Sequence, residues 1–108
     1  MTDIDIERSS GSVYTDLGHP QDSDMQLKAS LTSRISDILI ERNLTQMQAA
    51  DILGIPQPKL SRILRGQFRG ISAGKLLVCL NRLGQDVDIV VHEVADGDTG
   101  IGRTRVMD

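Results

Sequence analysis

The sequence predicts a mostly helical domain, a bundle of four to five helices followed by one C-terminal β-strand. Three observations lead to this expectation. Apolar residues recur at steps of three and four between residues 23 and 83. Glycines and capping residues divide that stretch into helix-sized segments. Residues 86–94 then change to an alternating pattern rich in β-branched residues. A chain of 108 residues is long enough for one such domain.

The N-terminal part of the chain divides into an arm and a first helix. Residues 1–22 are rich in Asp, Ser and Gly, which predicts a flexible arm whose segment 13–17 can pack on the body or on a partner. We expect the helix to begin with Ser23 as its N-cap. Asn43 is expected to end it, because Asn tolerates the left-handed conformation found at helix ends.

Two short helices joined by a tight turn are expected in residues 45–66. Thr45 and Gln48 have the spacing of a capping box, in which each side chain bonds the backbone N–H of the other residue. Gly54 supplies the sharp turn, where a Cβ would obstruct a positive φ. Two helices joined by a glycine-containing turn constitute a helix-turn-helix.

The second helix of this pair carries the candidate DNA contacts. Pro56 and Pro58 fall in its first turn, where proline is tolerated, and its outward side is polar and basic. Gln can bond adenine, Arg can bond guanine, and Ser or Lys can contact bases or phosphates. We expect contacts with bases or phosphates from Gln57, Pro58, Lys59, Ser61 and Arg62, and contacts with the phosphate backbone from Gln46, Arg65 and Arg69. The alternative is a helical hairpin whose polar side only faces water.

A fourth helix capped by Ser72 and a strand over residues 86–94 are expected to complete the domain, which then spans residues 23–94. A lone strand must pair with something. We expect it to pair with its copy across a two-fold axis, or alternatively with segment 13–17 of its own chain. The predicted dimerisation residues are Val87, Ile89 and Val91 on the strand, with Leu80 and Leu83 beneath it. Residues 95–108 are expected to be a disordered tail.

The distribution of charge matters more than the net charge of −3. Residues 1–27 carry −5, residues 28–82 carry +6 and residues 83–108 carry −4. A basic body between acidic flanks suits a nucleic-acid partner. The acidic N-terminus is unlike a signal peptide, no apolar run is long enough to span a bilayer, and the lone Cys79 excludes an internal disulfide. We therefore expect a cytoplasmic protein that does not act at a membrane.

No pattern in the chain predicts catalysis, a metal site or a cofactor. His19 and His92 lie far apart and neither is at ligand spacing with Cys79. The glycines at 66, 70 and 74 lack the Lys-Ser/Thr pair of a phosphate-binding loop. Cys79 lies in an apolar helical pattern and is expected to be a core residue.

The segment TQMQAADILGIPQPKLSRILRG, residues 45–66, closely resembles Cro/C1-type (XRE) helix-turn-helix regulators. Further similarity in residues 10–18 and 83–89 resembles the subfamily of small XRE proteins that includes HigA-like antitoxins. This resemblance implies a lambda-repressor-like fold and a homodimer that binds an inverted-repeat operator in double-stranded DNA. It also implies a small basic ribonuclease toxin of the RelE/HigB type as a partner; the alternative is a stand-alone regulator without a toxin. By position, Gln46, Gln57, Lys59, Ser61 and Arg62 match the family's DNA contacts, while Pro58 replaces a more usual polar residue.

Overall fold

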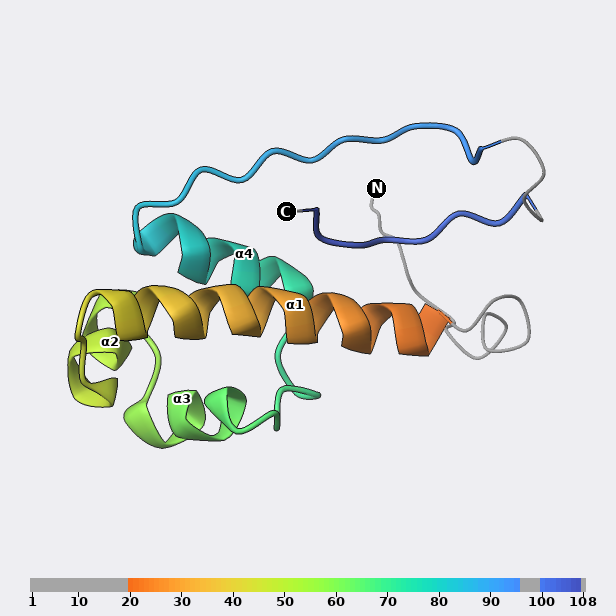
Figure 1. Ribbon diagram of the computed structural model, residues 1–108. Coiled ribbons are helices and arrows are strands. Elements are labelled where there is room, and N and C mark those ends of the chain that lie inside the picture. Colours follow the sequence, from red (N-terminus) through yellow and green to blue (C-terminus); the bar gives the residue numbers. More distant parts are fainter. Residues whose placement is uncertain (1–19, 96–99, 108) are drawn as a thin grey trace.

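The mostly helical architecture expected from the sequence is confirmed. The computed structural model describes residues 20–95 and 100–107, and within them the chain forms α1 (Pro20–Glu41), α2 (Gln46–Leu53), α3 (Gln57–Leu64) and α4 (Ala73–Arg82). The long helix α1 crosses the molecule, with α4 along one side of it and the α2–α3 pair on the other (Figure 1). Helix α1 contacts α3 and α4, and α2 contacts the same two helices. The short pair is therefore held from behind by two longer helices.

A single hydrophobic core fills the space between the four helices. Apolar side chains at steps of four along α1 enter it, and each of the shorter helices adds one side of its surface. The buried side chains at its centre are Leu31, Ile35, Leu39, Ala49, Ala50, Leu53, Leu60, Ile63, Leu76, Cys79, Leu80 and Leu83. Because these include Cys79, the interpretation of that residue as a core residue is confirmed.

The helix boundaries agree with the sequence at most ends, and one prediction was wrong. Helix α1 begins at Pro20 and not after Ser23, so Ser23 lies inside the helix and is not its N-cap. Proline suits the start of a helix because its fixed φ is helical and its missing N–H has no intrahelical partner there. At the other end Asn43 has φ 56°, the left-handed conformation that was predicted. The Ser72 hydroxyl accepts a hydrogen bond from the Lys75 N–H (3.0 Å), as expected of a cap for α4.

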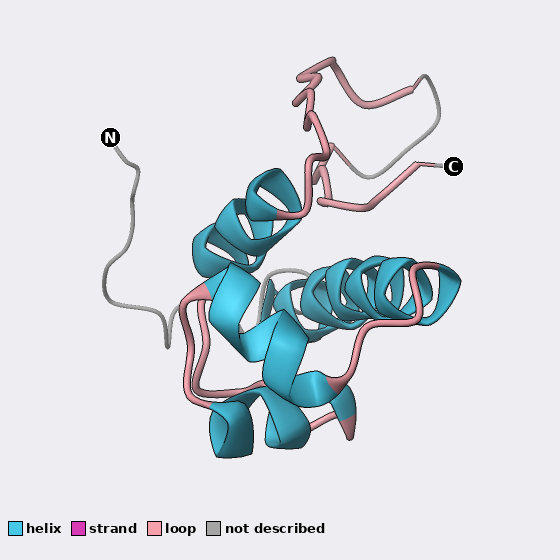
Figure 2. Ribbon diagram, turned by 90° about the vertical axis from the view of Figure 1, so that its left-hand side faces the viewer, coloured by secondary structure: helices cyan, strands magenta, loops and turns pink. Residues whose placement is uncertain are grey.

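The predicted strand is not confirmed in the described part of the chain. Residues 85–95 follow α4 as an extended segment that forms no β-ladder within residues 20–95 and 100–107 (Figures 1 and 2). Its side chains leave the core at once: Ile89, Val90 and Val91 are 75%, 79% and 90% exposed. A strand needs a partner for its backbone hydrogen bonds. No described segment supplies one, so pairing across a dimer stays a prediction.

The structure describes residues 100–107 of the predicted tail. Residues 100–107 run back along α1, on the side away from α3 (Figure 1). Val106 packs against the edge of the core. The Arg34 guanidinium donates a hydrogen bond from Nη2 to the Met107 carbonyl (3.0 Å). An apolar side chain and a cationic donor thus attach the segment to α1. Segment 13–17, the other predicted partner of the strand, lies outside the described residues.

Candidate nucleic-acid interface

The start of α2 is fixed by the predicted capping box. The Thr45 hydroxyl accepts from the Gln48 N–H (3.1 Å), and the Gln48 side-chain oxygen accepts from the Thr45 N–H (2.9 Å). Both bonds satisfy backbone donors that have no partner within the helix. The capping box is therefore confirmed, and it sets the direction in which α2 leaves α1.

The turn between α2 and α3 depends on Gly54. This residue has φ 70° and ψ 30°, and its N–H bonds the Ala50 carbonyl. The Arg82 guanidinium of α4 lies over the turn and donates from Nη1 to the Ile52 carbonyl (3.3 Å). Ile55, just after the turn, is buried in the core. The angle between the two helices is thus held from one side by α4 and from the other by the core.

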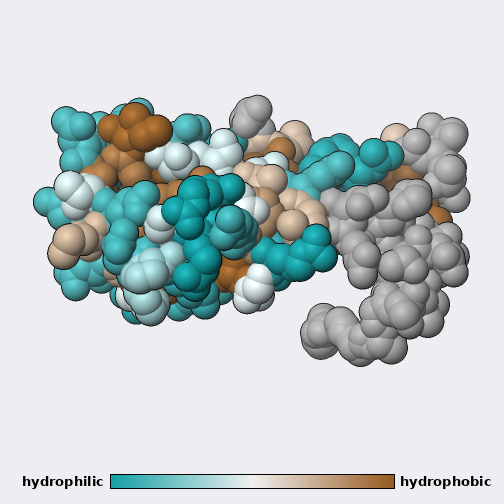
Figure 3. Space-filling model, turned by 90° about the horizontal axis from the view of Figure 1, so that it is seen from below, coloured by the Kyte–Doolittle hydropathy of each residue, from teal (hydrophilic) through white to brown (hydrophobic). Residues whose placement is uncertain are grey.

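Helix α3 has one buried side and one exposed side. Leu60 and Ile63 are buried, while Lys59 and Ser61 are half-buried. Pro58, Arg62 and Arg65 are exposed, and their spacing of four and then three residues puts them on one side of the helix. We call these three residues the α3 stripe. The side on which α2 and α3 lie is largely hydrophilic, with small hydrophobic patches between (Figure 3).

Two glutamines link the starts of α2 and α3. Gln57, the first residue of α3, donates from Nε2 to the side-chain oxygen of Gln46 (3.0 Å), the first residue of α2. After this bond Gln57 still has one N–H and its carbonyl oxygen, the pair that an adenine edge requires. Gln46 keeps its whole NH₂ group, which can donate to a phosphate. The bond therefore positions both side chains without removing the contacts predicted for them.

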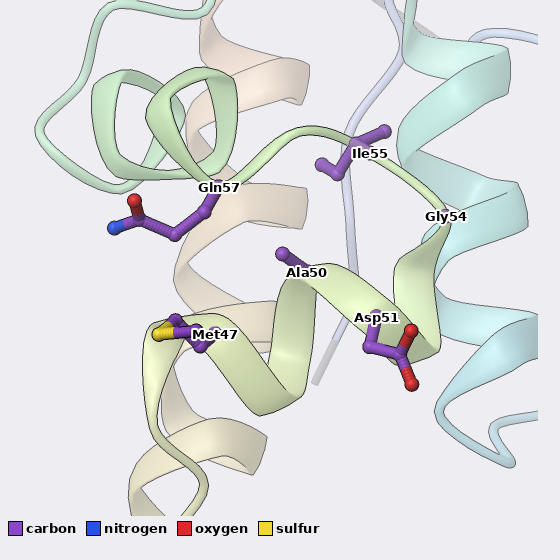
Figure 4. Close-up of a pocket in the computed structure, with 6 residues that line it drawn as sticks. All are labelled: Met47, Ala50, Asp51, Gly54, Ile55 and Gln57. Atoms are coloured by element: carbon purple, nitrogen blue, oxygen red, sulfur yellow. The ribbon is translucent and has the colours of Figure 1, made fainter.

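A shallow, open hollow of about 370 Å³ lies beside these glutamines. Met47 and Gln57 border it, with Ala50 between them; Asp51 lies farther along α2, and Gly54 and Ile55 follow the end of that helix (Figure 4). A buried small molecule needs more enclosure.

Arg65 does not extend freely from the end of α3. Its Nη1 donates to the Ser61 hydroxyl (2.9 Å), one turn earlier on the same helix. This bond holds the guanidinium along the helix surface, where it can reach a phosphate beside the groove. Ser61 is half-buried and already accepts one hydrogen bond, so among the predicted base contacts it is less accessible than Arg62.

The loop after α3 is anchored by Phe68, Ile71 and Lys28, none of which was among the predicted site residues. Phe68 and Ile71 are buried and flank the exposed Arg69. Lys28 of α1 reaches the loop from behind: its Nζ bonds the Arg69 carbonyl (3.3 Å) and the Asp24 carboxylate (3.2 Å), with a side chain only 9% exposed. Two apolar residues three apart within a basic loop were the available signal for the anchors. Nothing in the helical pattern of α1 distinguished Lys28 from a surface lysine.

The surface around α2, α3 and the following loop is positively charged. Lys59, Arg62, Arg65 and Arg69 lie on it, and Asp51 is the acidic residue of the same stretch, residues 45–71. Clustered basic side chains on one side of a domain favour a polyanion. The eight predicted contact residues thus lie at the starts of α2 and α3, along α3 and in the loop that follows it.

The predicted dimerisation residues separate into two groups. Val87, Ile89 and Val91 are exposed on the extended segment. Leu80 and Leu83 are buried in the core of their own chain, so they can support an interface from beneath but cannot form its surface. Val90 lies between Ile89 and Val91 and belongs to the other side of the alternating pattern, but its side chain is exposed as well.

The described residues contain little that suggests other chemistry. No group of three or more His, Cys, Asp or Glu side chains among them could hold a metal ion. Burial raises the pKa of the Cys79 thiol, although Lys75, Arg82 and Lys59 oppose this shift. A buried thiol that stays protonated is a poor nucleophile. None of the described helices is both long and apolar enough to cross a membrane.

Comparisons with known proteins agree with this geometry. Residues 13–92 match a family model described as a helix-turn-helix domain. A solved structure named "Putative XRE Family Transcriptional Regulator" is 31% identical, with a TM-score of 0.76 over 82% of this chain and 99% of that one. No curated protein matches the sequence. The chain therefore belongs to the helix-turn-helix family, among the XRE-type transcriptional regulators.

Proposed function

We propose that the protein is a sequence-specific DNA-binding repressor that acts as a homodimer and performs no catalysis. The observation that carries the proposal is the exposed α3 stripe beside the linked pair Gln46 and Gln57. The back of α3 is fixed in the core by Leu60 and Ile63. A recognition helix enters the major groove with side chains that contact base edges, and such contacts require a rigidly held helix. Helix α3 has both properties.

Base contacts are assigned to the start and middle of α3. Gln57 offers one donor and one acceptor to adenine, and Arg62 offers a fork of donors to guanine. Lys59, Arg65 and Arg69 lie at the edges of this surface, where phosphates flank the groove. Each protomer therefore supplies about three phosphate-neutralising side chains, and a dimer about six.

The first experiment measures DNA affinity against salt concentration. Duplexes are selected by the full-length protein from a random-sequence pool and then titrated at several salt concentrations. Six neutralised phosphates predict a slope of log K against log[salt] of about −5. Arg69→Ala removes one contact per protomer, so the slope should become shallower by about 2.

Arg105→Ala is the matched control for this measurement. It removes the same charge from an exposed residue of the C-terminal segment, on the opposite side of α1 from α3 (Figures 1 and 2). Its slope should equal that of the wild type. Equal slopes for wild type, Arg69→Ala and Arg105→Ala would contradict the proposed binding surface.

The dimer is proposed to form by pairing of segment 86–94 with its copy. Three successive apolar side chains, Ile89, Val90 and Val91, are exposed there, and the backbone of the segment lacks ladder partners within the described residues. Unpaired extended backbone with apolar side chains favours edge-to-edge pairing. A two-fold dimer also presents two copies of α3 to half-sites about one helical turn apart.

Light scattering tests this interface. Truncation after Leu83 removes the segment, and the full-length variant Val91→Lys puts one lysine on each copy of its exposed apolar stretch, so both should give the mass of a monomer. Ile40→Lys, which places the same charge on an exposed residue near the end of α1, should remain a dimer. A dimer mass for the truncated chain would exclude the segment as the interface.

We further propose that the repressor is the antitoxin of a type II toxin–antitoxin pair, autoregulates its operon and binds a small basic ribonuclease toxin of the RelE/HigB type. The support is the resemblance to HigA-like proteins and the acidic flanks, residues 1–27 at −5 and residues 83–108 at −4. Opposite charge favours association with a basic partner. The alternative is a stand-alone regulator.

An adjacent short reading frame that encodes a basic protein separates these two possibilities. Its product should co-purify with the full-length chain, and co-expression should relieve its toxicity. If no such frame lies beside the gene, or if the product neither binds nor is neutralised, the stand-alone regulator is the correct description. The DNA-binding proposal does not depend on this outcome.

A further inference from the structure

We propose that Pro58 recognises the methyl group of a thymine in the major groove, so that each operator half-site contains a thymine next to this residue. The inference rests on the proposed DNA-binding function and specifies what one position of that surface reads. Pro58 is the second residue of α3, is exposed, and lies in the α3 stripe with Arg62 and Arg65. It therefore occupies a place from which a side chain reaches the base edges.

The chemistry of proline leaves one partner in that groove. Pro58 has no side-chain donor or acceptor and no backbone N–H, and its carbonyl points along α3, so its exposed ring offers no hydrogen bond to a base edge or a phosphate. The thymine methyl is the apolar feature that a base presents in the major groove, whereas the other edges present donors and acceptors. A polar edge set against the pyrrolidine ring would lose its water without gaining a hydrogen bond. Thymine is the base that avoids this loss.

The neighbours of Pro58 fix where the thymine should lie. Gln57 directly precedes it and is held by Gln46 at 3.0 Å, so the adenine that Gln57 reads should be adjacent to the thymine. Arg62 lies four residues on, which is about 6 Å along the helix axis. Successive bases are about 3.4 Å apart. The guanine read by Arg62 should therefore lie within about two base pairs of the thymine.

A purely structural role for Pro58 makes a different prediction. Proline in the first turn favours helix formation through its fixed φ, and that effect does not depend on which base is present. Pro56, the N-cap residue of α3, is also exposed and makes no side-chain capping bond. It therefore provides a matched proline within the same turn but one step outside the helix.

The test replaces thymine by deoxyuridine, which removes the methyl and nothing else. The probe is the duplex that the full-length protein selects from a random pool, with each thymine substituted in turn. At one thymine per half-site the wild-type affinity should fall about fourfold, the effect of losing one buried methyl. Pro58→Ser should bind the thymine and uracil duplexes equally. Pro56→Ser should keep the wild-type ratio, since serine is a good N-cap.

Each outcome either supports or overturns the inference. If uracil is tolerated at every thymine, or if Pro58→Ser retains the fourfold ratio, Pro58 does not read a methyl and the DNA-binding proposal stands. If Pro56→Ser loses the ratio, the methyl contact belongs to Pro56 and the assignment is wrong. If the wild type selects no sequence above random DNA, the proposed function itself fails. The wild-type comparison requires no variant to fold.

Discussion

The turn between α2 and α3 gives a prediction whose size follows from the structure. Gly54→Ala forces a residue with a Cβ to adopt φ 70°, ψ 30°, the left-handed conformation. The added Cβ would lie 3.6 Å from the Cζ of Arg82, an ordinary van der Waals contact, so steric overlap adds nothing. The remaining cost is conformational, about 1–2 kcal/mol. For a domain of this size that loss lowers the Tm by about 4–16 °C.

The free energy of unfolding is measured by urea denaturation followed by circular dichroism, at one protein concentration because dimerisation contributes to stability. Gly70→Ala is the matched control. Gly70 does not have a positive φ, and a Cβ there meets nothing within 4 Å. That variant should be unchanged or more stable by up to about 1 kcal/mol. Gly54→Asn should lose less than Gly54→Ala, because Asn tolerates the left-handed region. Equal stability of the two alanine variants would refute the account of the turn.

Three other predictions concern the surroundings of the interface. Lys28→Met removes the donor to the Arg69 carbonyl, and we expect DNA affinity to fall about fivefold. In a double-mutant cycle, adding Arg69→Ala to Lys28→Met should cause little further loss. Fully additive losses would show that Lys28 does not act through Arg69. Thr45→Ala should lower the free energy of unfolding by about 1 kcal/mol through loss of the cap, as measured in urea, and an unchanged midpoint would contradict the capping account. Cys79 should react with a thiol reagent only as fast as the chain unfolds, and rapid labelling of the folded protein would contradict its burial. Because the pKa of the thiol is raised in the folded state, the free energy of unfolding should be constant below the unfolded thiol pKa of about 8.5 and decline above it.

The central part of the fold could be predicted from the sequence because its signals are local. A capping box needs two residues three apart, and a left-handed turn needs a glycine or asparagine at one position. Thr45, Gln48, Gly54 and Asn43 are therefore found where the pattern placed them. The period of the apolar residues along α3 also fixed which side of the helix is exposed, and with it the candidate contacts.

The features that were missed depend on contacts between distant parts of the chain. Lys28 is separated by 41 residues from the carbonyl it bonds, and no local pattern indicates such a pair. Val106 contacts the core from a segment whose composition resembles a disordered tail. The start of α1 was placed too late because Ser23 is a good cap by residue type, although Pro20 begins the helix. Lys28 and Val106 thus depend on tertiary contacts, whereas the start of α1 follows the local preference of proline for the first turn.

The strand shows a different kind of limit. Alternation in residues 86–94 reports that the segment prefers an extended conformation, and the structure agrees that it is extended. The alternating pattern does not indicate which other segment the strand would pair with. Pairing between copies requires a second chain, so neither the sequence of one chain nor its structure alone determines the interface.

The most direct test of the central claim is the specificity ratio of the double variant Gln57→Ala/Arg62→Ala. The ratio compares the affinity for the selected duplex with that for a random duplex at the same salt concentration. Base contacts contribute about 1–3 kcal/mol each, so loss of two should lower the ratio by at least about thirtyfold, while affinity for random DNA and the melting temperature change little. A double variant that retains the wild-type ratio would contradict the claim that α3 reads the operator.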